Sequence, residues 1–193
     1  FEFIGELALD GHLRPVSGTL TIAMACQQAR HRLLLPPANL DEASQLPEFE
    51  VYAASHLQQV CAHFLGNSLL KAAPQKSMAA SSRYPFDLAD VKGQLRPRRA
   101  LEIAAAGGHS LLFKGPPGTG KTLLASRLPS ILPPLNAQEN LEVASIYSVA
   151  NAQHTFGQRP FRAPHHTASA IALVGGGSQP KPGEITLAHL GVL

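Results

Sequence analysis

One segment of the sequence combines glycines, a lysine and a threonine at the spacing of a phosphate-binding loop. Residues 115–122 match the pattern G-x-x-x-x-G-K-[ST] at every fixed position. The glycines let backbone N–H groups turn towards an oxyanion, and a helix that follows them directs its first amides to the same point. The residues expected to bind phosphate are Gly115, Pro116, Pro117, Gly118, Thr119, Gly120, Lys121 and Thr122.

Two side chains at the end of this loop define the expected chemistry. Lys121 places a positive charge at the β- and γ-phosphates of a nucleotide and is the predicted catalytic residue. The hydroxyl of Thr122 is the predicted ligand of the Mg²⁺ ion that bridges these phosphates. The motif therefore predicts ATP and Mg²⁺ as cofactors.

Hydrolysis of ATP needs a further group, an acidic residue at the end of a neighbouring strand that orders Mg²⁺ and water. Its usual form is four apolar residues followed by Asp-Glu, and no such run follows Lys121. The acidic residues after it are Glu139, Glu142 and Glu184. Residues 187–193 resemble the approach to the missing strand. We therefore expect a fragment that ends just before its Walker B motif and that does not turn over ATP by itself.

Hydrophobic pattern and capping signals predict the elements that position this loop. The expected elements are a helix at 95–106, a strand at 110–113 leading into the loop, a helix at 121–128 ended by Pro129, a helix from 137 to about 149, and strand edges at 185–187 and 191–193. Asn136 and Glu139 have the spacing of a capping box for the third helix.

The first part of the chain predicts a separate α/β unit. The expected elements are a hairpin of strands 3–9 and 13–16 about Asp10-Gly11, a helix at 18–30, a strand at 33–35, a helix at 40–46, a strand at 49–52 and a helix capped by Ser55. Residues 71–84 are small and polar and predict a linker. The expected domains are thus 1–70 and 85–193.

Composition excludes several classes of protein. The 193 residues are 45% apolar and 15% charged, which fits a globular fold and excludes a disordered chain. The sequence has no run of about 18 apolar residues, so no membrane span is expected. Cys26 and Cys61 are expected to be reduced thiols of a cytoplasmic protein. His165 and His166 are adjacent, a spacing that does not favour zinc.

Four blocks of sequence, at 85–94, 98–135, 159–167 and 172–193, resemble the magnesium-chelatase-like AAA+ ATPases, and in particular the competence protein ComM (YifB) group. The resemblance implies part of a P-loop AAA+ (RecA-like) parallel-sheet core. It also implies that Asp90 to Gln94 lie near the adenine, with Val91 and Gly93 as expected cofactor-binding residues. Members of this group are hexameric, helicase-like ATPases that drive DNA branch migration in recombination and natural transformation.

The segment at 5–18 resembles part of the Lon-protease-like (ribosomal S5-like) domain that precedes the ATPase in this family. The catalytic lysine of Lon proteases follows within a few residues, but Thr19–Ile22 contains none and the next lysine is Lys71. A serine nucleophile needs a base nearby. We therefore expect part of the Lon-like fold without peptidase activity.

Two functions remain open at the level of sequence: a motor that moves DNA, and a magnesium-chelatase-type subunit that remodels a protein partner. Residues 154–183 carry Arg159, Arg162 and Lys181 and no acidic residue, so these three are the expected DNA-facing residues. The alternative is a structural insertion between subunits in which Arg162 pairs with a carboxylate of a neighbour.

Overall fold

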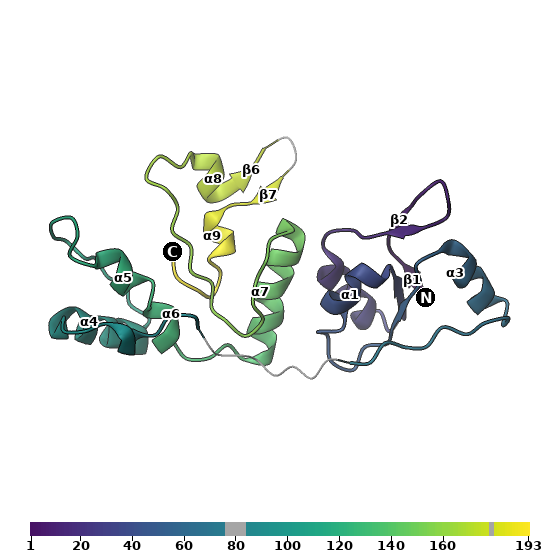
Figure 1. The fold of residues 1–193 in the computed structure, drawn as a ribbon, viewed down its shortest axis with the longest axis horizontal. Coiled ribbons are helices and arrows are strands. Elements are labelled where there is room, and N and C mark those ends of the chain that lie inside the picture. The colour runs from purple at the N-terminus through teal and green to yellow at the C-terminus, as the bar shows by residue number, and fades with distance from the viewer. Residues whose placement is uncertain (76–83, 178–179) are drawn as a thin grey trace. The chain divides into compact units, whose positions relative to one another are not determined.

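The chain folds into two units in the computed structural model, which describes residues 1–75, 84–177 and 180–193 (Figure 1). The first unit consists of Phe1–Ala79 with Ala144–Gln153, and the second of Ala80–Val143 with His154–Leu193. Within the described residues, no helix has the length and apolar character needed to cross a bilayer.

A parallel sheet forms the centre of the first unit. The elements in chain order are β1 (Glu2–Phe3), β2 (Glu6–Leu7), β3 (Leu13–Arg14), α1 (Thr19–Gln28), β4 (Leu33–Leu35), η1 (Pro37–Asn39), α2 (Leu40–Ala43), β5 (Val51–Ala53) and α3 (Leu57–Phe64). The sheet order is β1-β4-β5, with both pairs parallel. All three leucines of β4 are buried, as expected for a central parallel strand covered on both faces.

Most of the elements predicted for this unit are present. The hairpin about Asp10-Gly11 is confirmed, because β2 and β3 pair antiparallel with Leu7 opposite Leu13. The prediction that Ser55 caps α3 is wrong. His56 precedes the helix, and its ring nitrogen accepts a hydrogen bond from the backbone N–H of Gln58.

The second unit is mainly helical. Its elements are η2 (Leu88–Asp90), α4 (Leu95–Gly107), α5 (Lys121–Ala125), α6 (Leu128–Ile131), α7 (Ala137–Ala150, whose second half is grouped with the first unit), α8 (Ala170–Val174), β6 (Gly175–Gly176), β7 (Lys181–Pro182) and α9 (Glu184–Leu187). The capping box of α7 is confirmed. Asn136 N–H donates to Glu139 at 2.8 Å, and Glu139 N–H donates back at 2.9 Å.

The strand predicted at 110–113 is wrong for this structure. These residues have no regular secondary structure, because a strand requires a ladder and none of the described residues pairs with them. Parallel pairing among the described residues of 85–193 is limited to a bridge between Phe161 and Val192. That bridge agrees with the predicted strand edge at 191–193.

Two further predictions of secondary structure are wrong. The stretch 185–187 lies in α9, a short helix that begins at Glu184. The helix after the loop stops at Ala125 rather than 128, and Pro129 lies in the first turn of α6. Proline lacks the N–H that would continue α5 but is tolerated where a new helix begins.

The predicted linker begins inside the first unit. Ala72 forms an antiparallel bridge with Tyr52, and the Ala73 N–H donates to the carbonyl of Val51 at 2.8 Å. Residues 76–83 of that prediction lie outside the described residues.

Candidate nucleotide-binding site

The glycine loop lies between the irregular segment 110–114 and α5, which begins at Lys121 (Figure 1). Gly118 and Gly120 each have a φ of +78°, a conformation that side chains with a Cβ rarely adopt. A Cβ at Gly118 would meet nothing within 4 Å, so the loop is open at this point. Residues 115–119 are exposed to solvent.

Lys121 is held across the loop by the loop itself. Its Nζ donates to the carbonyl oxygens of Gly115 at 3.0 Å and Pro116 at 2.6 Å. The Thr119 hydroxyl also donates to the Pro116 carbonyl, at 3.0 Å. Carbonyl oxygens of the loop therefore hold the ammonium group, while Thr122 is exposed next to Lys121 in the chain.

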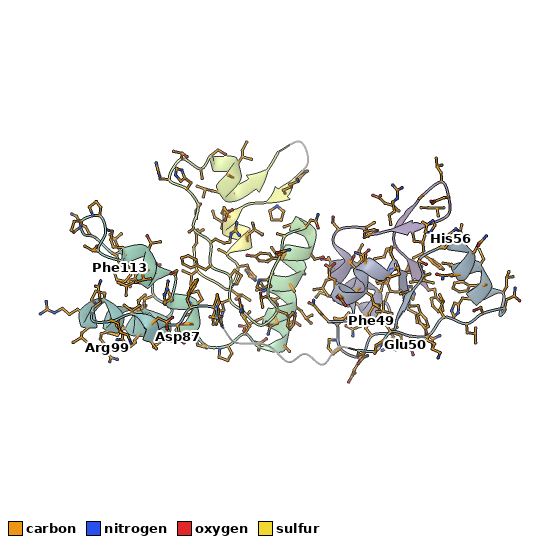
Figure 2. All side chains as sticks on the ribbon, viewed as in Figure 1. Phe49, Glu50, His56, Asp87, Arg99 and Phe113 are labelled. Atoms are coloured by element: carbon orange, nitrogen blue, oxygen red, sulfur yellow. The ribbon has the colours of Figure 1, made fainter. Side chains whose placement is uncertain are left out.

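A hydrophobic cluster includes residues on both sides of the loop in the sequence. Its buried members, on η2, α4, α5 and the turn after η2, are Leu88, Val91, Leu101 and Leu124. Phe113, labelled near α5 in Figure 2, packs against this cluster just before the loop begins. The start of the loop and the start of α5 thus rest on one core.

The two residues predicted near the adenine have different environments. Val91 is 3% exposed and belongs to the hydrophobic cluster, so its side chain supports the site rather than facing a ligand. Gly93 is exposed, with a φ of +67° and nothing within 4 Å of a built Cβ. Of these two residues, Gly93 is therefore the one that is exposed to solvent.

The segment Asp90 to Gln94, predicted near the adenine, ends at Gln94, but sequence reasoning did not predict that this side chain contacts the glycine loop. Its Nε2 donates to the carbonyl oxygen of Thr119 at 2.9 Å, which connects the segment before α4 to the loop. Gln94 has a φ of +54° and a ψ of +40°, an uncommon backbone conformation for a residue other than glycine, asparagine or aspartate. The signal in the sequence is a glutamine that follows a glycine directly at a helix start.

A cavity of about 820 Å³ lies beside Lys121 and Thr122 within the second unit. Its lining includes Ser110, Leu111 and Phe113 together with residues 161–164 and 191–193. The segment predicted as a strand and the bridged pair Phe161–Val192 therefore border the same space.

The predicted DNA-facing residues make contacts within this chain. Arg159 is 13% exposed in its side chain and donates to the carbonyls of Pro133 and Leu190 at 2.7 and 2.6 Å. Arg162 forms a bidentate pair with Glu184, with both N–O distances 2.6 Å. Lys181 is exposed on β7. Two of the three cations thus bind groups of the protein itself.

Histidines do not form a metal centre within the described parts of the chain. No group of three His, Cys, Asp or Glu side chains gathers there. The rings of His165 and His166 stack with centroids 4.1 Å apart, and His165 hydrogen bonds to Thr167. Burial lowers the pKa of His154. This imidazole therefore requires a lower pH to become charged than an exposed histidine.

A glycine loop, a lysine fixed across it and a helix that begins at that lysine are the parts of a P-loop domain. The chain belongs to the family described as "Magnesium chelatase, subunit ChlI", whose model matches residues 87–193. The match covers the loop, its supporting cluster and the sequence from there to Leu193.

Comparison with curated proteins confirms the expected ComM/YifB group. The chain is 48% identical to "Uncharacterized protein YifB" of Salmonella typhimurium, over 100% of this chain and 38% of that protein. It is 46% identical to "Competence protein ComM" of Haemophilus influenzae, over 100% of this chain and 39% of that protein. The chain therefore spans about two fifths of the length of these relatives.

Proposed function

We propose that this chain is the ATP-binding part of an AAA+ ATPase of the ComM type. The observation that carries the proposal is the ammonium group of Lys121, held over the open glycine loop by the carbonyls of Gly115 and Pro116. A cation already held beside a glycine loop binds phosphate at a lower entropy cost than a flexible side chain would.

The donor set fits ATP with Mg²⁺. The open space at Gly118 accommodates phosphate oxygens, Lys121 neutralises the β- and γ-phosphates, and the exposed Thr122 hydroxyl is available as a ligand for Mg²⁺. Bound Mg²⁺ would supply charge neutralisation of the triphosphate. In this arrangement the chain's own residues bind and orient the nucleotide.

Replacing Lys121 tests nucleotide binding. We expect Lys121→Ala to weaken binding of MgATP by about 30- to 150-fold, which corresponds to the roughly 2–3 kcal/mol of a charge-assisted contact. Lys114→Ala, which removes an exposed lysine just before the loop, is the matched control and should change the affinity less than about threefold. Calorimetric titration of both variants decides the matter, and equal affinities for the two variants would contradict the proposal.

Turnover of ATP depends on an acidic residue that is still to be identified. The three acids after Lys121 make other contacts: Glu139 caps α7, Glu142 lies 3.6 Å from His189, and Glu184 binds Arg162. We therefore propose that residues 1–193 bind ATP without hydrolysing it. Measurable phosphate release by this chain, abolished by Lys121→Ala, would refute this part of the proposal.

We propose DNA as the partner and a hexameric ring as the assembly of the intact protein, acting in recombination. Support comes from the ComM-type sequence and the basic segment 154–183. The internal contacts of Arg159 and Arg162 favour a bracing role for both, and Lys181 remains the exposed candidate for a DNA contact. Part of a Lon-like domain in residues 1–70 and the cytoplasmic location also remain predictions.

The family description favours one alternative, a chelatase-type subunit that remodels a protein partner. The two functions differ in their response to DNA. A DNA motor shows ATPase activity that forked or single-stranded DNA stimulates, with binding that weakens steeply as salt is raised. A chelatase-type subunit is indifferent to DNA and needs its protein partner for full activity.

A further inference from the structure

The backbone of Gln94 indicates that its side chain has a specific task. Gly93 and Gln94 both have positive φ values, +67° and +54°, and Gln94 immediately precedes α4. A glutamine in this conformation costs about 1 kcal/mol relative to glycine, which fits the same turn without strain. Strained residues of this kind are concentrated at functional sites.

The side chain of Gln94 reaches the glycine loop. Its Nε2 donates to the Thr119 carbonyl at 2.9 Å, and a Cβ built on Gly120 would lie 3.6 Å from the same nitrogen atom. The peptide unit between Thr119 and Gly120 is therefore in direct contact with the amide group of Gln94. This contact links residues 25 positions apart in the sequence.

The direction of this bond determines where the next amide points. In a trans peptide the C=O and N–H groups point in opposite directions. Because Gln94 holds the Thr119 C=O on its own side, the Gly120 N–H is turned to the other side of the peptide. That N–H is one of the donors that a loop of this type offers to a phosphate.

The residues on both sides of Gln94 are held in place by further contacts. Asp87 and Asp90 form a capping box that orders the turn before it, and Val91 is buried in the hydrophobic cluster. The guanidinium of Arg98 donates to the Val91 carbonyl at 3.2 Å, and the Arg98 N–H donates to the Gln94 carbonyl at 3.0 Å. The hydrogen bond from Gln94 to Thr119 therefore connects the loop to this ordered segment.

From these contacts, we propose that Gln94 is a positioning residue that orients the Thr119–Gly120 peptide for phosphate binding. The inference rests on the proposed function, since it concerns the same loop. It adds a residue outside the glycine motif, and it assigns the effect to the phosphate groups of the ligand rather than to the base.

Three substitutions of Gln94 separate the side-chain bond from the backbone strain. Gln94→Asn keeps the amide and tolerates the positive φ, but its side chain is one methylene too short to reach Thr119. Gln94→Met keeps the length and lacks the donor. Gln94→Gly removes the strain together with the bond. All three should weaken binding of MgATP by about fivefold, the effect of one neutral hydrogen bond.

Two readouts distinguish positioning from a general role in stability. The thermal midpoint of Gln94→Gly should stay within about 2 °C of the parent, because relief of strain offsets the lost bond and the added freedom of the unfolded chain. Inorganic tripolyphosphate should lose affinity by the same factor as MgATP. A loss confined to MgATP would assign Gln94 to the base and overturn the proposal.

The parent protein and Lys121→Ala complete the experiment. If the parent binds MgATP, Lys121→Ala binds it more weakly as predicted, and the Gln94 variants bind like the parent, the inference about Gln94 is wrong while the proposed function stands. If the parent and Lys121→Ala bind MgATP equally poorly, the proposed function fails and the inference fails with it.

Discussion

The pair between Arg162 and Glu184 allows a quantitative test of the second unit. Both guanidinium contacts are 2.6 Å long, and the side chains are 33% and 24% exposed. Arg162 also donates its backbone N–H to the Val192 carbonyl at 2.8 Å. The pair therefore attaches the start of α9 to the segment that carries the parallel bridge.

The expected magnitude follows from the geometry. Exposed ion pairs contribute about 0–1 kcal/mol, and bidentate charge-assisted bonds are roughly twice as strong as neutral ones. For this half-buried pair we expect a coupling free energy of about 1–2 kcal/mol between Arg162→Met and Glu184→Met. The control is the exposed i,i+3 pair Arg99–Glu102 on α4, where about 0.3–0.5 kcal/mol is expected.

Urea unfolding of the four proteins in each cycle measures this coupling. The Arg162 hydrogen bonds lower the pKa of Glu184 from its ordinary value of 4.5. A carboxylate with a lowered pKa stabilises the fold above that ordinary value, and the contribution is lost as pH falls through the lowered pKa. The coupling should therefore be present at pH 7 and decrease below about pH 4.5.

Two results would refute this reasoning. One is a coupling between Arg162 and Glu184 no larger than that of the control pair. The other is an Arg162→Met variant with unchanged stability and a salt dependence of DNA binding that is lower by about one unit. The second result would support the prediction from the sequence that Arg162 faces DNA.

Two further substitutions test the support of the site, each by urea unfolding. Asn136→Ala removes the side chain that accepts the Glu139 N–H and should destabilise the fold by about 1 kcal/mol, while Gln138→Ala on the same helix should cost less than about 0.5 kcal/mol. Leu101→Ala creates a cavity in the cluster below the loop and should cost about 2–4 kcal/mol, whereas Ile103→Ala, at a position 53% exposed, should stay within about 0.5 kcal/mol. Equal losses within either pair would contradict the burial and contacts described.

The loop and its helix could be predicted because the information for them is local. Three spaced glycines at 115, 118 and 120, followed by a lysine, determine the turn, and Asn136 with Glu139 determines the start of α7. The prediction of a strand at 110–113 is wrong because local sequence does not determine strand pairing. A strand forms when another segment supplies its ladder, and that pairing cannot be read from a serine followed by three apolar residues.

The roles of the charged residues could not be read from the sequence for a similar reason. Arg159, Arg162 and Lys181 give residues 154–183 a formal charge of +3, which predicts a surface for a polyanion. The partners of two of these cations lie outside that segment, at Pro133, Glu184 and Leu190. Net charge of a segment therefore overstates the charge that is available to a ligand.

Binding and hydrolysis of ATP have different structural requirements in this family of folds. The groups proposed to bind phosphate lie within one continuous stretch and are fixed by short-range contacts, such as that between Lys121 and Pro116. Gln94 adds a contact from the neighbouring helix start, which is still part of the same small core. Hydrolysis needs an acid placed by a strand ladder beside the loop. Nucleotide affinity should therefore respond to changes at Gln94 and Lys121, while turnover requires the sheet as well.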